Sequence, residues 1–110
     1  MVGKKIKNID ELIQKYIQEL LKQIPVKLVI LYGSYAKGTP RDWSDIDLVV
    51  VSSAFGGGTE EDYLLLSRVA RKITPQIEAI PLRPEDLENY EKGDFIDEIL
   101  KNGKQLYKAA

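Results

Sequence analysis

The chain has 110 residues, of which 44% are apolar, which is enough for one compact domain with a single core. Its 16 basic and 17 acidic residues give a net charge of −1, so it lacks the strongly basic character of nonspecific nucleic-acid-binding proteins. The absence of cysteine and histidine excludes disulfides, zinc–thiolate sites, imidazole bases and cysteine nucleophiles. Catalysis would rest on carboxylates, hydroxyls, amines, guanidinium groups and oxygen-bound metal ions. No apolar run approaches the ~20 residues of a membrane span, and no signal-peptide core is present, so we expect a cytoplasmic protein without membrane contact.

A first helix is predicted over residues 9–24, where apolar residues recur at spacings of three and four. Asn8 is a suitable N-cap for this helix, and Glu11 follows it at the spacing of a capping box. Pro25 is expected to end the helix.

Two strongly apolar segments come next and are predicted to be strands. Residues 26–32 are rich in β-branched side chains, and residues 46–51 form a second apolar run. Between them we expect a short helix over residues 34–37, closed by Gly38, and then a polar loop over residues 39–44.

The glycine-rich residues 54–58 predict a mobile connection to a third helix, which Thr59 caps and whose first turn is acidic. The inner face of this helix is predicted to contain Tyr63, Leu66, Val69, Ala70 and Ile73. A third strand over residues 76–82 is expected after Pro75.

The C-terminal part predicts a short helix beginning at residues 83–86, a final helix over residues 94–101 and a short edge strand over residues 105–107. Helices therefore alternate with three or four strands. We expect one α/β (α+β) domain over residues 1–110, with a small mixed sheet flanked by helices.

The dipeptide Gly33-Ser34 stands where the first strand meets the short helix, and it has two interpretations. It is an ordinary strand-to-helix turn with Ser34 as the N-cap, or a phosphate-binding turn built from backbone N–H groups and the Ser34 hydroxyl. The two interpretations are compatible.

Two aspartates, Asp45 and Asp47, follow Ser34 after ten residues and open the second apolar strand. Residues at i and i+2 of a strand share a face, so both carboxylates should point the same way. The simple interpretation is a solvated strand start. The functional one is a magnesium site, because Mg²⁺ takes oxygen ligands and relieves the repulsion between neighbouring carboxylates.

Three further charged residues are candidates for the same site. Glu78 lies within the third apolar strand, and a parallel arrangement with residues 45–51 would bring it near the aspartates; alternatively it faces solvent. Lys37 and Arg41 lie between the two halves of the motif and could reach a triphosphate, or they are simply solvated loop charges.

Together these residues resemble the nucleotidyltransferase superfamily of DNA polymerase β. Gly33-Ser34, ten residues and then Asp45-Ile46-Asp47 match its motif, and the flanking residues look like the minimal nucleotidyltransferase branch, which includes MntA-like antitoxins. The resemblance is centred on residues 26–82. The tail, with residues 80–87 and 95–107, is also similar to that group.

The resemblance implies the nucleotidyltransferase fold and a division of roles among the residues. Asp45 and Asp47 would hold two Mg²⁺ ions, while Gly33 and Ser34 would bind the phosphates of ATP. A third carboxylate, here Glu78 instead of the usual aspartate, would complete the metal site and help to deprotonate the acceptor hydroxyl. Such minimal forms are often encoded beside a HEPN-domain protein, and some transfer AMP to that toxin.

Three functions remain open at this stage. The first is Mg²⁺-dependent transfer of a nucleoside monophosphate, AMP above all, to a hydroxyl of a HEPN-domain partner. The second is a catalytically weak nucleotide-binding module that neutralises its partner by direct binding. The third, modification of a small molecule, needs walls around the acceptor that so short a chain could supply only as a homodimer.

Overall fold

A four-stranded mixed sheet forms the centre of the computed structural model, which describes residues 9–38 and 45–110. In the order β3-β2-β1-β4, the strands are β1 (Leu28–Tyr32), β2 (Ile46–Val51), β3 (Ile77–Leu82) and β4 (Lys104–Lys108). β1 is antiparallel to β2 and β4, whereas β2 and β3 are parallel. The predicted mixed α/β sheet is confirmed, including its edge strand near the C-terminus.

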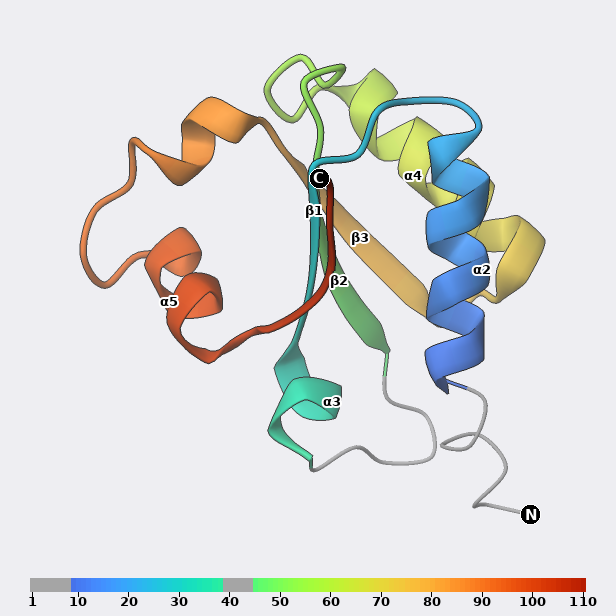
Figure 1. The fold of residues 1–110 in the computed structure, drawn as a ribbon, viewed down its shortest axis with the longest axis horizontal. Coiled ribbons are helices and arrows are strands. Elements are labelled where there is room, and N and C mark those ends of the chain that lie inside the picture. The colour runs from blue at the N-terminus through green and yellow to red at the C-terminus, as the bar shows by residue number, and fades with distance from the viewer. Residues whose placement is uncertain (1–8, 39–44) are drawn as a thin grey trace.

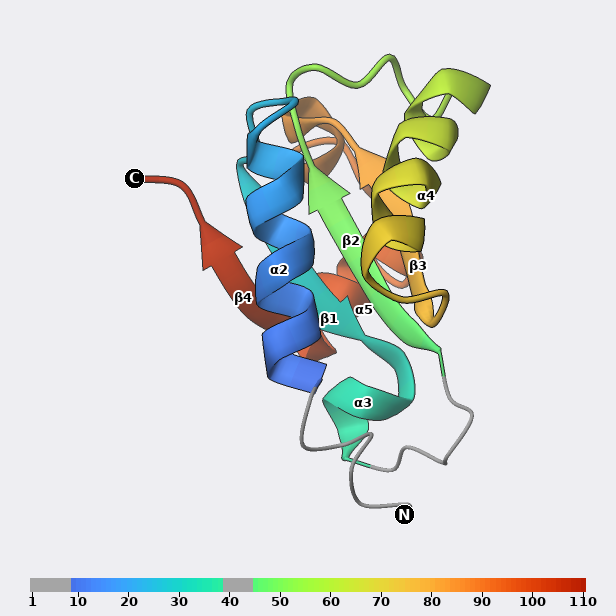
Figure 2. The ribbon, with the colours of Figure 1, turned by 90° about the vertical axis from the view of Figure 1, so that its right-hand side faces the viewer.

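Helices cover both faces of the sheet (Figures 1 and 2). α2 (Ile9–Leu21) and α4 (Glu60–Ile73) pack on one face, and α5 (Phe95–Asn102) and the 3-10 helix η1 (Pro84–Leu87) lie on the other. The short α3 (Gly33–Lys37) follows β1 directly. No helix within residues 9–38 and 45–110 is long and apolar enough to cross a membrane.

Alternate residues of the strands divide the core into two clusters. The larger cluster joins α2 and α4 to the sheet through side chains such as Tyr16, Leu48 and Leu66. The smaller one, on the opposite face, contains Ile30, Val49, Val51 and Ile99. This division places the odd-numbered residues of β2 on the face of α5, which also fixes the direction of Asp47.

α2 ends earlier than the sequence predicted. Its last residue is Leu21, and the chain then closes in a tight turn in which the Gln23 N–H donates to the Leu20 carbonyl over 2.9 Å. Pro25 disfavours helical backbone at the residue before it, so the apolar Ile24 packs on the core from outside the helix. The N-cap predicted at Asn8 lies outside the described residues, whereas Glu11, its predicted partner, is exposed in the first turn of α2.

The glycine-rich loop before α4 is held in place by Asp62 rather than left loose as predicted. Asp62 is only 7% exposed, and its carboxylate accepts hydrogen bonds from the backbone N–H groups of Gly56, Gly58 and Thr59. The Thr59 hydroxyl in turn accepts from the Asp62 N–H over 3.2 Å, which completes the capping box and confirms Thr59 as the cap.

Replacing Asp62 with alanine is expected to lower the free energy of unfolding by about 2 kcal/mol, because a cap and several buried hydrogen bonds are lost together. Burial acts to raise the pKa of Asp62, but its backbone donors outweigh burial and hold that pKa below its usual value. The stabilisation is therefore present above about pH 4 and is lost as the pH falls through the lowered pKa. Urea unfolding at pH 7 and pH 3 measures both effects. Glu61→Ala, an exposed neighbour, is the control, and equal stability of the two variants would contradict the prediction.

Candidate functional site

Two acids that the sequence singled out lie in one row across the sheet with Tyr32. Asp47 of β2 is paired with Tyr32 of β1 on one side and with Glu78 of β3 on the other. Directly paired residues point to the same face of a sheet, so these three side chains lie together on the face of α5. The parallel arrangement expected to bring Glu78 beside the aspartates is therefore present.

The turn at Gly33 contacts Asp47 directly. Gly33 has a φ of +76°, and a Cβ atom at this position would clash with Oδ2 of Asp47. Only glycine satisfies both demands, because the left-handed backbone and the close approach each disfavour a side chain. The Gly33 turn and the aspartate motif thus form a single site, although 13 residues separate Gly33 from Asp47.

Ser34 does not cap the short helix, contrary to one of its two interpretations. α3 begins at Gly33, its N-cap is Tyr32, and no side chain makes a capping hydrogen bond there. The positive φ of Gly33 turns the chain so sharply that Ser34 already lies in the first helical turn. Gly38 closes the helix as predicted, with a φ of +77° and its N–H directed at the carbonyls of Ser34 and Tyr35.

Burial and its acidic neighbours raise the proton affinity of Asp47. Burial, followed by the charges of Asp45 and Glu78, raises the pKa of Asp47 above its usual value. Among the residues that the structure describes, none of these three acids forms an ion pair with a lysine or arginine. The site therefore carries negative charge that no described cation of the protein neutralises.

Tyr32 completes the row with a neutral hydroxyl. Burial and the charges of Asp47 and Glu78 raise the pKa of Tyr32 to about 12, so the phenol remains protonated at neutral pH. Its ring meets that of Phe95 on α5 edge to face, with centroids 5.4 Å apart. Tyr32 can donate a hydrogen bond in this site, but it cannot act as a base there.

The two basic candidates differ in what the structure says of them. Lys37 is exposed at the end of α3 and, with Gly33, lines a small cavity of about 140 Å³ between α3 and α5. It therefore lies beside the Gly33 turn. Arg41 lies outside the described residues.

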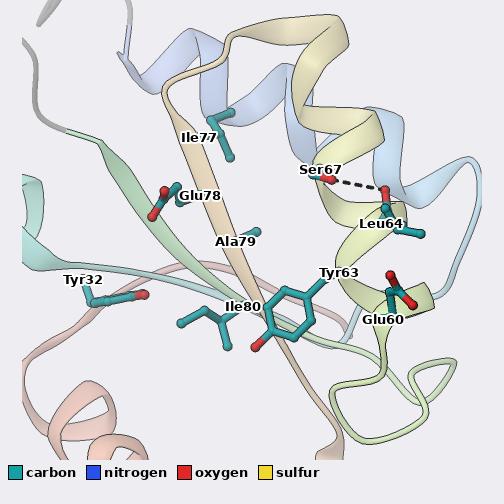
Figure 3. Close-up of a pocket in the computed structure, with 9 residues that line it drawn as sticks. All are labelled: Tyr32, Glu60, Tyr63, Leu64, Ser67, Ile77, Glu78, Ala79 and Ile80. Carbon is teal, nitrogen blue, oxygen red and sulfur yellow. Dashed lines mark hydrogen bonds between the residues drawn. The ribbon is translucent and has the colours of Figure 1, made fainter.

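A larger cavity of about 420 Å³ adjoins the acids between α4 and β3 (Figure 3). Its walls include Tyr32, Glu78, Tyr63 and Leu64. Tyr63 was predicted to face the core, but it is 46% exposed because the start of α4 extends beyond the edge of the sheet. The sequence held one indication of this apolar surface, because Leu64 stands off the apolar stripe of α4. In the structure Leu64 is 47% exposed and lies next to Tyr63.

The oxygen ligands of this site suit a hard divalent cation. Asp45, Asp47 and Glu78 provide carboxylates and uncompensated charge, the donor chemistry that Mg²⁺ prefers. Within residues 9–38 and 45–110, no three acidic side chains form a closed metal-binding cluster. Such a cluster is not required, because Mg²⁺ commonly uses one or two carboxylates and completes its shell with substrate phosphates and water.

The family model for polymerase β nucleotidyltransferases matches residues 14–110. The chain belongs to this family. The protein is therefore a nucleotidyltransferase, and the matched region contains Gly33, Asp45, Asp47 and Glu78.

Curated relatives agree with this assignment. A protein of Methanocaldococcus jannaschii, assigned as a protein adenylyltransferase, is 30% identical over 105 residues, which are 91% of this chain and 99% of the relative. A second protein of that organism with the same assignment is 38% identical over 47 residues, or 43% of this chain and 55% of the relative.

Solved structures show the same fold. A nucleotidyltransferase assigned in Sulfolobus solfataricus superposes with a TM-score of 0.65 at 23% identity, covering 90% of this chain and 79% of that one. A toxin–antitoxin structure with AMP-PNP gives a TM-score of 0.63 at 22% identity, covering 91% and 73%. A mutant of the MntA–HpeT toxin–antitoxin pair gives 0.62 at 24% identity, covering 87% and 72%.

Proposed function

We propose that this nucleotidyltransferase uses Mg²⁺ to transfer AMP from ATP to a hydroxyl of a partner protein. The observation that carries the proposal is the row of carboxylates without a described protein cation, set directly against the Gly33 turn. Metal ions would neutralise these acids, and the turn would leave room for phosphate oxygens. Phosphoryl transfer requires both the metal ions and a place for the phosphate oxygens.

The proposed roles follow from the position of each residue. Asp45 and Asp47 hold the divalent ions, and Gly33 and Ser34 bind the phosphates of ATP, with Lys37 and Arg41 as further phosphate ligands. When bound, the ions stabilise the attacking and leaving oxygens of an in-line displacement. Glu78 helps to hold them and accepts the proton of the acceptor hydroxyl at a carboxylate oxygen. The acceptor oxygen bonds to the α-phosphorus, the bond from that phosphorus to the bridging oxygen breaks, and pyrophosphate leaves.

A protein acceptor is proposed from the relatives. Two similar proteins of M. jannaschii are assigned as protein adenylyltransferases, and two structures with this fold belong to toxin–antitoxin pairs. We therefore propose that the chain is the antitoxin of such a pair and that its partner is a HEPN-domain toxin.

Isotope position provides the direct test. The enzyme, Mg²⁺ and the proposed HEPN-domain partner are incubated with ATP labelled at either the α- or the γ-phosphorus. We expect label on the partner from α-labelled ATP alone, and none after the divalent ions are removed with EDTA. Label from γ-labelled ATP would indicate a kinase, and no label from either would refute the proposal.

Glu78→Gln is expected to lower the rate of label transfer about 10²-fold, since loss of a general base commonly costs 10²–10⁴ in rate. Glu78→Asp keeps the carboxylate and should retain much more activity. Glu88→Gln, which alters an exposed acid outside the cavity, is the matched control. Initial rates at pH 7 measure the effect. Full activity of Glu78→Gln would exclude the proposed role.

A further inference from the structure

β3 is an edge strand, and its backbone offers hydrogen-bonding groups on the side away from β2. The carbonyls of Gln76 and Leu82 accept from β2 and from Ser52 just after it, over 2.8 and 3.0 Å. Because successive backbone groups of a strand alternate in direction, those of Ile77, Ala79 and Pro81 face outward. Within the described residues, no strand pairs with this side of β3.

The outward edge is open over only part of its length. Pro81 has no N–H and blocks strand addition at its own position. The N–H of Ile77 is already directed at the Thr74 carbonyl over 3.4 Å. Ala79 is then the one outward position of β3 that offers both an N–H and a carbonyl, and it lies next to Glu78.

The cavity of about 420 Å³ lies along this open part of the edge (Figure 3). Tyr63 and Leu64 of α4 form an exposed apolar wall, and Ala79 lies opposite them on β3. The charged residues that line the cavity are both acidic, Glu60 and Glu78. Apolar walls, an acidic rim and an unpaired strand edge suit an extended peptide with apolar and basic side chains.

We infer that this groove binds an extended, basic segment of the protein that accepts the nucleotide, with strand pairing at Ala79. The inference rests on the proposed function, because it places the acceptor hydroxyl beside Glu78. Neighbouring strands lie about 4.8 Å apart, so a residue of the bound segment that pairs with Glu78 lies close to it. Paired residues point to the same face of a sheet, which places this side chain on the face of the acids. The groove thereby selects an acceptor by its main chain and charge.

Paired variants of the enzyme test the groove with the HEPN-domain partner as acceptor. Glu60→Lys should raise the KM for the acceptor about tenfold, whereas Glu61→Lys, with the same charge change in the same helical turn but outside the groove, should not. Tyr63→Ala should act like Glu60→Lys, with exposed Tyr90→Ala as its control. Ala79→Pro removes the outward N–H while leaving the ladder to β2, and its thermal melting is checked first.

The affinity for ATP distinguishes the groove from the nucleotide site. All groove variants should bind a fluorescent ATP analogue as the wild type does. Unchanged acceptor KM in Glu60→Lys and Tyr63→Ala would overturn the inference, and so would weakened ATP binding, because the groove would then belong to the nucleotide.

A binding assay tests the inference even if the wild type transfers no label. A fluorescent nonapeptide with a central serine, alternating valines and two lysines should bind the Asp45→Asn/Asp47→Asn variant by anisotropy. Replacing its lysines with glutamates, or N-methylating its central amides, should weaken binding about tenfold or more. No binding of the lysine peptide, or equal binding of all three, would overturn the inference, whereas failed labelling with selective peptide binding would refute only the proposed function.

Discussion

Replacing Asp45 and Asp47 together with asparagine is expected to abolish nucleotidyl transfer and leave the protein folded, with a higher melting temperature. Charge stabilisation by metal ions contributes several kcal/mol to such reactions, so transfer should fall about 10³-fold or more.

Burial and the charges of Asp45 and Glu78 raise the pKa of Asp47 in the folded state. The folded protein then binds this proton more tightly than the unfolded chain, and stability falls as the pH rises from about 4 through the raised pKa. Neutral asparagines remove that cost at pH 7.

Label transfer from α-labelled ATP and melting curves at pH 4 and pH 7 measure the two effects. The stabilising effect of the double substitution should be larger at pH 7 than at pH 4. Asp10→Asn/Glu11→Gln on exposed positions of α2 is the control for a loss of two charges. Retained transfer would exclude the metal-holding role of the aspartates.

The same variant separates catalysis from simple binding. If the chain acts as a catalytically weak module, the double variant should still neutralise the proposed HEPN-domain partner in a growth assay. If it acts by transferring AMP, neutralisation should be lost although the complex still forms in gel filtration. The distinction matters because Glu78 stands where the family resemblance implies an aspartate.

Local sequence patterns predicted most of the fold. β2 was predicted with its observed bounds, because a run of branched apolar residues begins sharply after Asp45 and ends at Ser52. The end of α2 was predicted three residues too late, because Ile24 continues the apolar period although Pro25 prevents it from being helical. Tyr63 was assigned to the core for a related reason. Helical periodicity identifies one face of a helix but not where the sheet beneath it ends.

The candidate site was predicted only as a set of residues. Their spacing indicated that Asp45 and Asp47 share a face, and a parallel third strand was needed to add Glu78. Three features of the site depend on strand register and on helix placement. They are the contact of Asp47 with Gly33, the neutral Tyr32 between the acids and Phe95, and the cavity beside Tyr63. Register and helix placement are properties of the tertiary structure, and no local periodicity of the sequence indicates them.

Gly33→Ala is expected to lower the transfer rate about 10²-fold, since misplacing a reacting group by an ångström can cost that much. The new Cβ would clash with Oδ2 of Asp47, so the carboxylate must move away from the row that it forms with Glu78. The φ of +76° adds a cost of about 1–2 kcal/mol in the free energy of unfolding for any residue other than glycine. Initial rates and urea unfolding measure the two losses.

Gly38→Ala separates the backbone cost from the contact with Asp47. Gly38 has a φ of +77°, almost the same as that of Gly33, but a Cβ built on it meets nothing within 4 Å. Gly38→Ala should therefore lose about 1–2 kcal/mol of stability and keep its activity. Combining Gly33→Ala with Asp47→Ala should restore the part of stability that the clash removed, without restoring transfer. If Gly33→Ala and Gly38→Ala behave alike in both assays, the contact between the turn and the aspartate has no part in catalysis, because the two substitutions differ only in what the new methyl group meets.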